Sequence, residues 1–292
     1  MELPITFEQN MRTLLKDDYD SYAACLDQPM HHGIRINTMK ISVEEFLKIN
    51  PFHLRPVPWC ENGFYYDETL DKPSKHPYYF AGLYYIQEPS AMTPAHVLPV
   101  EAGDRVLDIC AAPGGKTMYA ASLAGQTGRV ISRDLTENKT ELIEENVDRL
   151  GLTNVTVEAW DARELDENLV GKADVVIADL PCSGLGIMGR KNDIKYNVTG
   201  DSIDELAQLQ RDILDTVSGY VRPGGTLVYS TCTIDSRENQ NNVKWFVENH
   251  DFETVSIDEI VPGRGGDKGF VTLLQGVDEC DGFFISKFVR TK

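Results

Sequence analysis

Residues 106–117, with the sequence VLDICAAPGGKT, constrain the fold of this chain more than any other stretch. Apolar residues surround Asp108 and predict a buried strand, and residues 115–124 predict a helix. The turn between them is built from small residues, which let the main chain lie against a ligand. The free amides of a helix N-terminus also attract negative charge. In an open α/β sheet, such a turn at the carboxyl end of a strand is where a cofactor binds.

Two phosphate-binding patterns do not fit this turn. A P-loop requires a glycine at the position of Cys110, and the dinucleotide pattern Gly-x-Gly-x-x-Gly is absent from the turn. On this segment alone, an ordinary strand-to-helix turn without a ligand is an equally good interpretation. The features of the following residues favour a ligand.

The composition excludes several classes of protein. A chain of 292 residues with 41% apolar residues can form one large domain or two smaller ones around a packed core. We expect no membrane-spanning segment, because no run of about eighteen apolar residues occurs. The N-terminus lacks the basic and apolar regions of a secretory signal, which favours a cytoplasmic protein. The net charge of −18 argues against non-specific binding of nucleic acids, but it permits a local basic groove.

The six cysteines are widely spaced and form no Cys-x-x-Cys pair, which argues against a zinc site. A chain with a core of this size does not need disulfides, so we expect reduced thiols. We also expect the protein to bind no metal and to be a monomer.

Strand and helix patterns alternate from residue 104 onward, which predicts a doubly wound α/β sheet. We divide the chain into an N-terminal α+β domain at residues 1–100 and a catalytic domain at residues 101–292, with Pro99 and Gly103 near the boundary. The expected strands are 105–109, 129–133, 155–158, 174–178, 226–230, 252–255 and 282–289, and the expected helices after the boundary are 115–124, 137–150, 202–221 and 237–249.

Aspartates follow three neighbouring strands of this predicted sheet. Asp134, Asp161 and Asp179 come after the second, third and fourth strands, whose carboxyl ends converge on one crevice. A single aspartate of this kind is usually a turn or cap residue, but three beside the small-residue turn favour an adenosine-containing ligand. We expect Asp134 on the ribose hydroxyls, Asp161 near the adenine amino group and Asp179 near the reacting centre. Because no dinucleotide pattern is present, S-adenosylmethionine is preferred over a nicotinamide cofactor.

Two cysteines also follow strands of this sheet: Cys182 in residues 179–186 and Cys232 in residues 230–233. A lone cysteine is usually a small buried apolar residue. Two beside a predicted methyl donor fit methylation of carbon 5 of cytosine, because a thiolate added to carbon 6 makes carbon 5 nucleophilic. A base must then remove the carbon 5 proton before the thiolate leaves. The target base must leave its stack to enter such a pocket.

Residues 106–117, 179–184 and 230–233 resemble the methyl-donor motif and the two cysteine motifs of the Sun/Fmu-type RNA cytosine-5 methyltransferases. The resemblance covers nearly the whole chain and implies a Rossmann-like class I methyltransferase sheet with a smaller N-terminal RNA-binding domain. It implies that Cys232 is the nucleophile and that Cys182 assists the final elimination and product release. By the same resemblance, Asp179 holds the cytosine edge and lies near the donor, as part of the cofactor site. It also implies that the methionine part of the donor is wrapped by Cys110, Ala111, Ala112, Pro113, Gly114, Gly115 and Lys116.

Within that family, residues 1–100 resemble the bacterial small-subunit ribosomal RNA enzymes of the RsmF type, and the part from Asp179 onward resembles the RsmB type. The resemblance therefore favours 16S ribosomal RNA as the substrate. Methylation of tRNA, and a non-catalytic RNA chaperone or assembly factor that binds the donor, stay open as alternatives. The residues that we expect to contact RNA are Arg35, Asn37, Arg190, Lys191 and Lys195.

Overall fold

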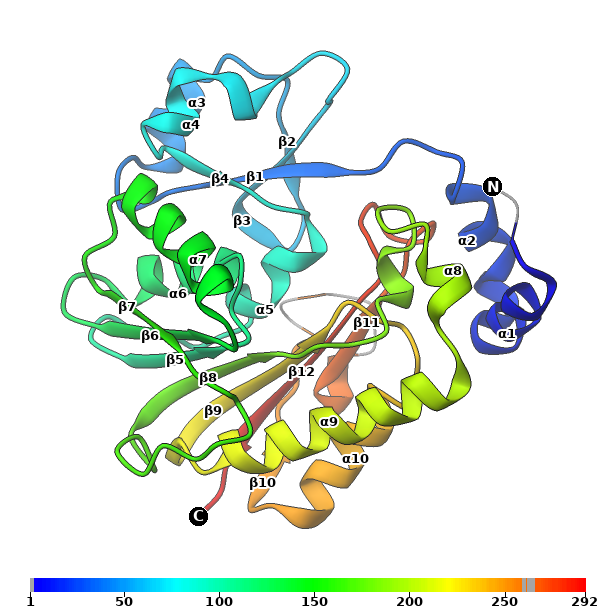
Figure 1. Cartoon of the computed structure of the whole chain (residues 1–292). Helices are drawn as coiled ribbons and strands as arrows, with labels where there is room; N and C mark the ends of the chain where they lie inside the picture. The colour runs from blue at the N-terminus through cyan, green and yellow to red at the C-terminus, as the bar shows by residue number, and fades with distance from the viewer. Residues whose placement is uncertain (1–2, 259–260, 262–265) are drawn as a thin grey trace.

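The computed structural model describes residues 3–258, 261 and 266–292, which contain two β-sheets (Figure 1). The smaller sheet is antiparallel, has the strand order β2-β3-β1-β4 and lies in the N-terminal part of the chain. Its strands are β1 (His32–Ile36), β2 (Arg55–Val57), β3 (Cys60–Tyr66) and β4 (Tyr84–Ile86). The helices of this part are α1 (Ile5–Leu15), α2 (Tyr19–Cys25), α3 (Val43–Ile49), α4 (Pro77–Phe80) and α5 (Thr93–His96).

The larger sheet has the order β10-β12-β9-β8-β5-β6-β7, and β11 pairs with β12 beside this path. Strands β5 to β9 are parallel, whereas β12 runs antiparallel to β9. The expected α/β sheet is therefore confirmed. Its strands are β5 (Arg105–Ile109), β6 (Arg129–Asp134), β7 (Val155–Ala159), β8 (Ala173–Asp179), β9 (Val221–Thr231), β10 (Phe252–Thr254), β11 (Phe270–Leu273) and β12 (Phe283–Arg290).

Helices cover both faces of the larger sheet (Figure 1). One face packs against α6 (Gly115–Ala124) and α7 (Glu137–Leu150), and the other against α9 (Gly200–Ser218) and α10 (Gln240–Asn249), which follow the short α8 (Ile194–Asn197). The strand order reverses between β5 and β8, because β6 and β7 lie on one side of this pair and β9 on the other. The carboxyl ends of strands at such a point form the crevice in which α/β proteins bind ligands. No helix in the described ranges is long and apolar enough to span a membrane.

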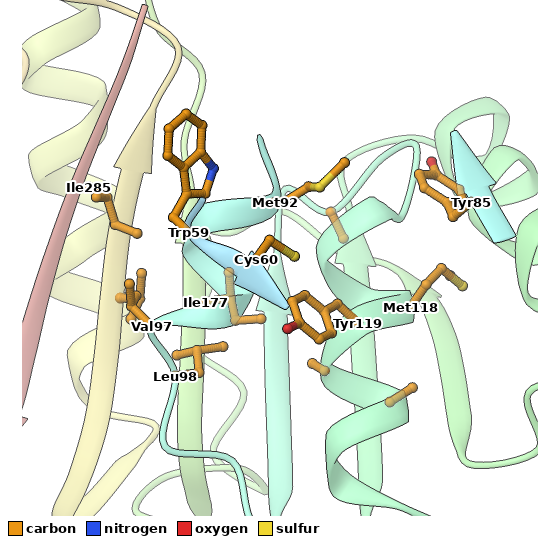
Figure 2. Close-up of a cluster of buried hydrophobic side chains, with 14 of the residues drawn as sticks. Trp59, Cys60, Tyr85, Met92, Val97, Leu98, Met118, Tyr119, Ile177 and Ile285 are labelled. Carbon is orange, nitrogen blue, oxygen red and sulfur yellow. The ribbon is translucent and has the colours of Figure 1, made fainter. Parts of the chain in front are cut away.

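A single apolar cluster joins the N-terminal sheet to the larger one. Trp59 and Met92 from the N-terminal part pack in the same buried cluster as Tyr119 on α6 and Ile177 on β8 (Figure 2). Large aromatic side chains contribute much of the apolar area that such a core removes from water. The buried aromatic residues of the N-terminal part include Tyr65, Tyr84 and Tyr85.

The structure corrects two of the expected RNA contacts, because Arg35 and Asn37 are only 3% and 5% exposed. The Arg35 guanidinium donates to the side-chain oxygen of Gln87 and lies 4.6 Å from the ring centre of Tyr119. Asn37 donates from Nδ2 to the main-chain oxygen of Leu150 at the end of α7. These two side chains therefore contact α6 and the end of α7, and very little of their surface is accessible to RNA.

Candidate active site

Parallel pairing brings the predicted donor and cysteine segments to one edge of the larger sheet. Ile109, the last residue of β5, is in register with Ala178 of β8, and Asp179 is in register with Ser230 of β9. The segments that follow β5, β8 and β9 therefore begin side by side. These are the small-residue turn, the Cys182 loop and the Cys232 loop.

The turn between β5 and α6 has an unusual main-chain path. Cys110 and Gly114 both have positive φ angles, 58° and 99°. A Cβ atom on Gly115 would lie only 2.8 Å from the side-chain nitrogen of Gln87, so a larger residue at that position would require the Gln87 side chain to move. Among the described residues no side chain caps α6, whose first amides have no partner inside the helix. The turn thus presents hydrogen-bond donors at the sheet edge.

Asp134 fixes this turn to the neighbouring strand. Its carboxylate accepts hydrogen bonds from the amides of Ala112 and Leu135, at 2.9 and 2.8 Å, and from Lys139. Asp161 accepts two side-chain hydrogen bonds from Arg163, and these bonds hold the pKa of Asp161 below its ordinary value. Asp134 is the last residue of β6 and Asp161 follows β7, while the ribose and adenine contacts stay predictions.

Asp108, in the middle of β5, is fully buried. Thr117 donates to its Oδ2 at 2.5 Å, and the Thr117 hydroxyl also contacts the Ser132 hydroxyl at 2.8 Å. The other oxygen, Oδ1, is buried without a hydrogen-bond partner in the described part of the chain. Burial raises the pKa of the Asp108 carboxyl to about 7.

The raised pKa of Asp108 predicts a pH-dependent effect of Asp108→Asn. An unfolded aspartate has a pKa of about 3.9, so the folded protein binds an extra proton between that pH and 7. The resulting stabilisation of the wild type is lost as the pH rises through 7. We expect the free energy of unfolding of the asparagine variant, relative to that of the wild type, to increase by on the order of 2 kcal/mol from pH 5 to pH 8. Urea unfolding at both pH values measures this difference.

The matched control is Asp20→Asn, because the Asp20 side chain is 95% exposed. We expect its effect on the free energy of unfolding to change little between the two pH values. A pH-independent effect of Asp108→Asn would contradict the raised pKa.

Lys116 and Asp179 form an ion pair with 2.6 Å between Nζ and Oδ2. Burial lowers the pKa of the Lys116 ammonium, but the attraction and hydrogen bond of Asp179 outweigh burial and leave this pKa raised. The second oxygen of Asp179 accepts a hydrogen bond from Ser230 at 2.6 Å. The pair therefore ties the start of α6 to the ends of β8 and β9.

The sulfur atoms of Cys182 and Cys232 lie 3.3 Å apart, and both residues are free thiols. The hydrogen bond between them lowers the pKa of Cys232 and raises that of Cys182. The positive charges of Lys116 and Lys191 also lower the pKa of Cys232, against the effects of burial and of Asp179. Because the thiolate is the reactive form of cysteine, this arrangement makes Cys232 the better nucleophile of the two.

The three basic residues expected to contact RNA after the Cys182 loop have different surroundings. Arg190 forms an ion pair with Asp281 and donates to the main-chain oxygen of His31, so it fastens its loop to the N-terminal part. Lys191 is exposed and close enough to influence Cys232. Lys195 is partly buried, and its ammonium lies 5.2 Å from the ring centre of Tyr196. The RNA contacts of these three residues stay predictions.

The sequence reasoning missed a group of buried polar residues behind the two cysteines. Glu238 and Gln210 are both fully buried and contact the Cys182 loop. The only sequence signal was a polar run directly after Cys232, which we assigned to the start of a helix. Within the described residues, no group of three or more His, Cys, Asp or Glu side chains could hold a metal ion.

Comparisons with known proteins identify the family. The family model described as 16S rRNA methyltransferase RsmB/F matches residues 95–289. The chain belongs to this RsmB/F family. A second model, described as the N-terminal domain of 16S rRNA methyltransferase RsmF, matches residues 3–89.

Curated relatives of this chain are named ribosomal RNA small subunit methyltransferase F. The protein of this name from Escherichia coli O7:K1 is 32% identical over 307 residues, and the alignment covers 99% of this chain and 64% of the relative. The Shigella boydii serotype 18 protein has the same identity and coverage. The chain thus spans 64% of the length of these relatives.

Two crystal structures share the fold of this RsmB/F chain. A methyltransferase homolog protein from Pyrococcus horikoshii is 30% identical with a TM-score of 0.85, and the match covers 98% of this chain and 94% of that one. NSun6 from Pyrococcus horikoshii with SFG has a TM-score of 0.88 at 24% identity, with 99% and 98% of the two chains covered. The second structure supports the fold alone.

Proposed function

We propose that this protein methylates carbon 5 of a cytosine in RNA, with S-adenosylmethionine as the methyl donor and 16S ribosomal RNA as the substrate. The observation that carries the proposal is the contact between Cys182 and Cys232, 3.3 Å apart beside the Lys116–Asp179 ion pair, in a chain of the RsmB/F family. Neither a lone buried thiol nor an ordinary nucleotide site requires two such thiols at one sheet edge.

The residues at this edge fit the donor. The N-terminus of α6, which no described side chain caps, suits the carboxylate of the donor. The Oδ1 atom of Asp108 is a buried hydrogen-bond acceptor that has no partner among the described residues. In this proposal residues 110–116 hold the methionine part, Asp134 the ribose and Asp161 the adenine. When bound, S-adenosylmethionine supplies an electrophilic methyl group.

Cys232 starts the reaction in this proposal. Its thiolate forms a bond to carbon 6 of the flipped cytosine, and the electron pair of the carbon 5–carbon 6 double bond becomes available at carbon 5 for the methyl group. Asp179 holds the cytosine edge, and Lys116 keeps that carboxylate in place. The lowered pKa of Cys232 increases the fraction of thiolate that is available for this attack.

The reaction ends with an elimination. A base removes the proton from carbon 5, its bonding electrons restore the ring double bond, and the Cys232 thiolate is expelled. Cys182 is the group that we assign to assist this step, because its sulfur lies beside the leaving sulfur. Lys191 and Lys195 provide local positive charge for the RNA backbone on a protein with a net charge of −18. We further propose that the protein acts in the cytoplasm, as a monomer.

Bisulfite sequencing tests this proposal. Purified protein is incubated with S-adenosylmethionine and either 16S ribosomal RNA or total tRNA, each prepared without 5-methylcytosine. We expect one or a few protected cytosines in the 16S RNA. Protection in tRNA alone would show that tRNA is the substrate, and it would still support methylation of carbon 5 of cytosine. No protection in either RNA, together with RNA binding, would favour an assembly factor and reject the enzymatic proposal.

A further inference from the structure

Glu238 lies behind the two cysteine loops and is fully buried just before α10. Its Oε2 accepts hydrogen bonds from the amide of Ser183 at 2.9 Å and from the side chain of Gln210 at 3.0 Å. Its Oε1 accepts a hydrogen bond from the Ser183 hydroxyl. Ser183 directly follows Cys182, so this carboxylate holds the Cys182 loop by both its main chain and a side chain.

The same network reaches the Cys232 loop. The Ser183 hydroxyl lies 2.8 Å from the hydroxyl of Thr233, the residue after Cys232. Asn239, next to Glu238, donates to the main-chain oxygen of Thr233 at 2.9 Å. The residue that follows each cysteine is thus tied to one short segment, 238–239. Movement of this segment would change the distance between the two sulfur atoms.

The partners of Glu238 indicate its ionised form. Its carboxylate oxygens accept from Ser183 and Gln210, both of which donate, and a buried carboxylate needs such donors to stay charged. Burial raises the pKa of Glu238, and these hydrogen bonds oppose that effect.

The charges around the sulfur pair are unequal. Glu238 lies on the side of Cys182, where its negative charge disfavours a Cys182 thiolate in addition to the hydrogen bond and burial. Cys232 faces the positive charges of Lys116 from α6 and of Lys191, which follows the Cys182 loop in the chain. It also faces the negative charge of Asp179 from β8. The charge of Glu238 therefore favours the protonated form of Cys182, and the two lysines favour the thiolate of Cys232.

We propose that Glu238 is a positioning residue of the methyl-transfer site, which clamps the two cysteine loops together and directs the shared thiol proton to Cys182. The pair then holds one proton, and Cys232 keeps a free electron pair for attack on the cytosine. This inference rests on the proposed function in assigning the attack to Cys232. The clamp and the proton bias themselves can be measured without RNA or methyl donor.

The test is the pH profile of alkylation by iodoacetamide, followed separately for Cys182 and Cys232 by mass spectrometry in the full-length protein. Because the thiolate reacts, the ratio of the two rates reports where the proton lies. In Glu238→Gln the negative charge is lost, so we expect the Cys232:Cys182 ratio to fall roughly tenfold. The midpoint of the Cys232 profile should rise. An unchanged ratio and midpoint would overturn the proposal.

Two further variants complete the test. Asp235→Asn is the matched control, because this buried carboxylate lies three residues before Glu238 but binds the side chain of Arg237, and we expect the wild-type ratio. Glu238→Asp keeps the charge on a shorter side chain, so we expect a ratio within about twofold of wild type but slower methyl transfer. If Glu238→Gln unfolds, all cysteines are labelled alike and the test rests on Glu238→Asp. A Cys232:Cys182 labelling ratio near one in folded Glu238→Asp would overturn the charge effect.

These outcomes separate the inference from the proposed function. If the wild type methylates no RNA but Glu238→Gln shifts the labelling ratio, the methyltransferase proposal fails and the clamp stands. If the wild type methylates RNA and the ratio is insensitive to Glu238, only the clamp fails.

Discussion

Cys232→Ala is expected to lower the rate of methyl transfer to RNA by about a thousandfold or more, because the variant has no group to add to carbon 6 of cytosine. Cys182 is not expected to replace the missing thiolate, since burial and the negative charge of Glu238 raise its pKa even when the hydrogen bond with Cys232 is lost. The measurement is incorporation of a labelled methyl group from S-adenosylmethionine into 16S ribosomal RNA.

The matched control is Cys25→Ala. Cys25 ends α2 in the N-terminal part, where its sulfur contacts the main-chain oxygen of Tyr22. We expect this variant to keep its methyl-transfer rate. Cys232→Ala should also still bind the donor, since Asp134 and the turn before α6 are unchanged, and calorimetry can check this. Methyl transfer by Cys232→Ala at a rate near that of the wild type would reject Cys232 as the nucleophile.

Much of the fold could be predicted from the sequence, because the parallel strands are short apolar runs between clear helix patterns. Strand β5 (Arg105–Ile109) and helix α6 (Gly115–Ala124) have the expected bounds. Strand β9 begins earlier than expected, at Val221, because Val221 pairs with Ala173 of β8 before a register shift, after which pairing resumes at Thr226 and Val175. Strand β11 (Phe270–Leu273) was not expected, since four residues at the side of a sheet carry almost no periodic signal.

Some residues of the candidate site could be predicted from local sequence patterns, whereas others depend on contacts between distant parts of the chain. Cys182 and Cys232 could be placed together because each follows a strand of one parallel sheet. Glu238 could not be found, because its role depends on contacts with Ser183, which is 55 positions away in the sequence. Arg35 was misjudged because strand alternation shows which residues share a face, but not that another domain covers that face.

Cys182→Ala is expected to accumulate a covalent protein–RNA adduct that survives denaturation. The variant retains the Cys232 thiol for attack on carbon 6, but it lacks the neighbouring group that assists elimination. The adduct should appear on a denaturing gel as a band that contains both labelled RNA and protein. The double variant Cys182→Ala/Cys232→Ala is the control and should form none, because the adduct bond is made by Cys232.

The pH dependence of this adduct tests the thiol pair itself. In the wild type the hydrogen bond from Cys182 lowers the pKa of Cys232. Without that donor the pKa of Cys232 should rise, so the adduct should form more slowly at pH 6.5 and recover as the pH increases toward 9, where the thiolate is more abundant. An adduct that forms equally fast at all these pH values would show that Cys182 does not activate Cys232. The absence of any adduct, with intact RNA binding, would remove Cys182 from the elimination step.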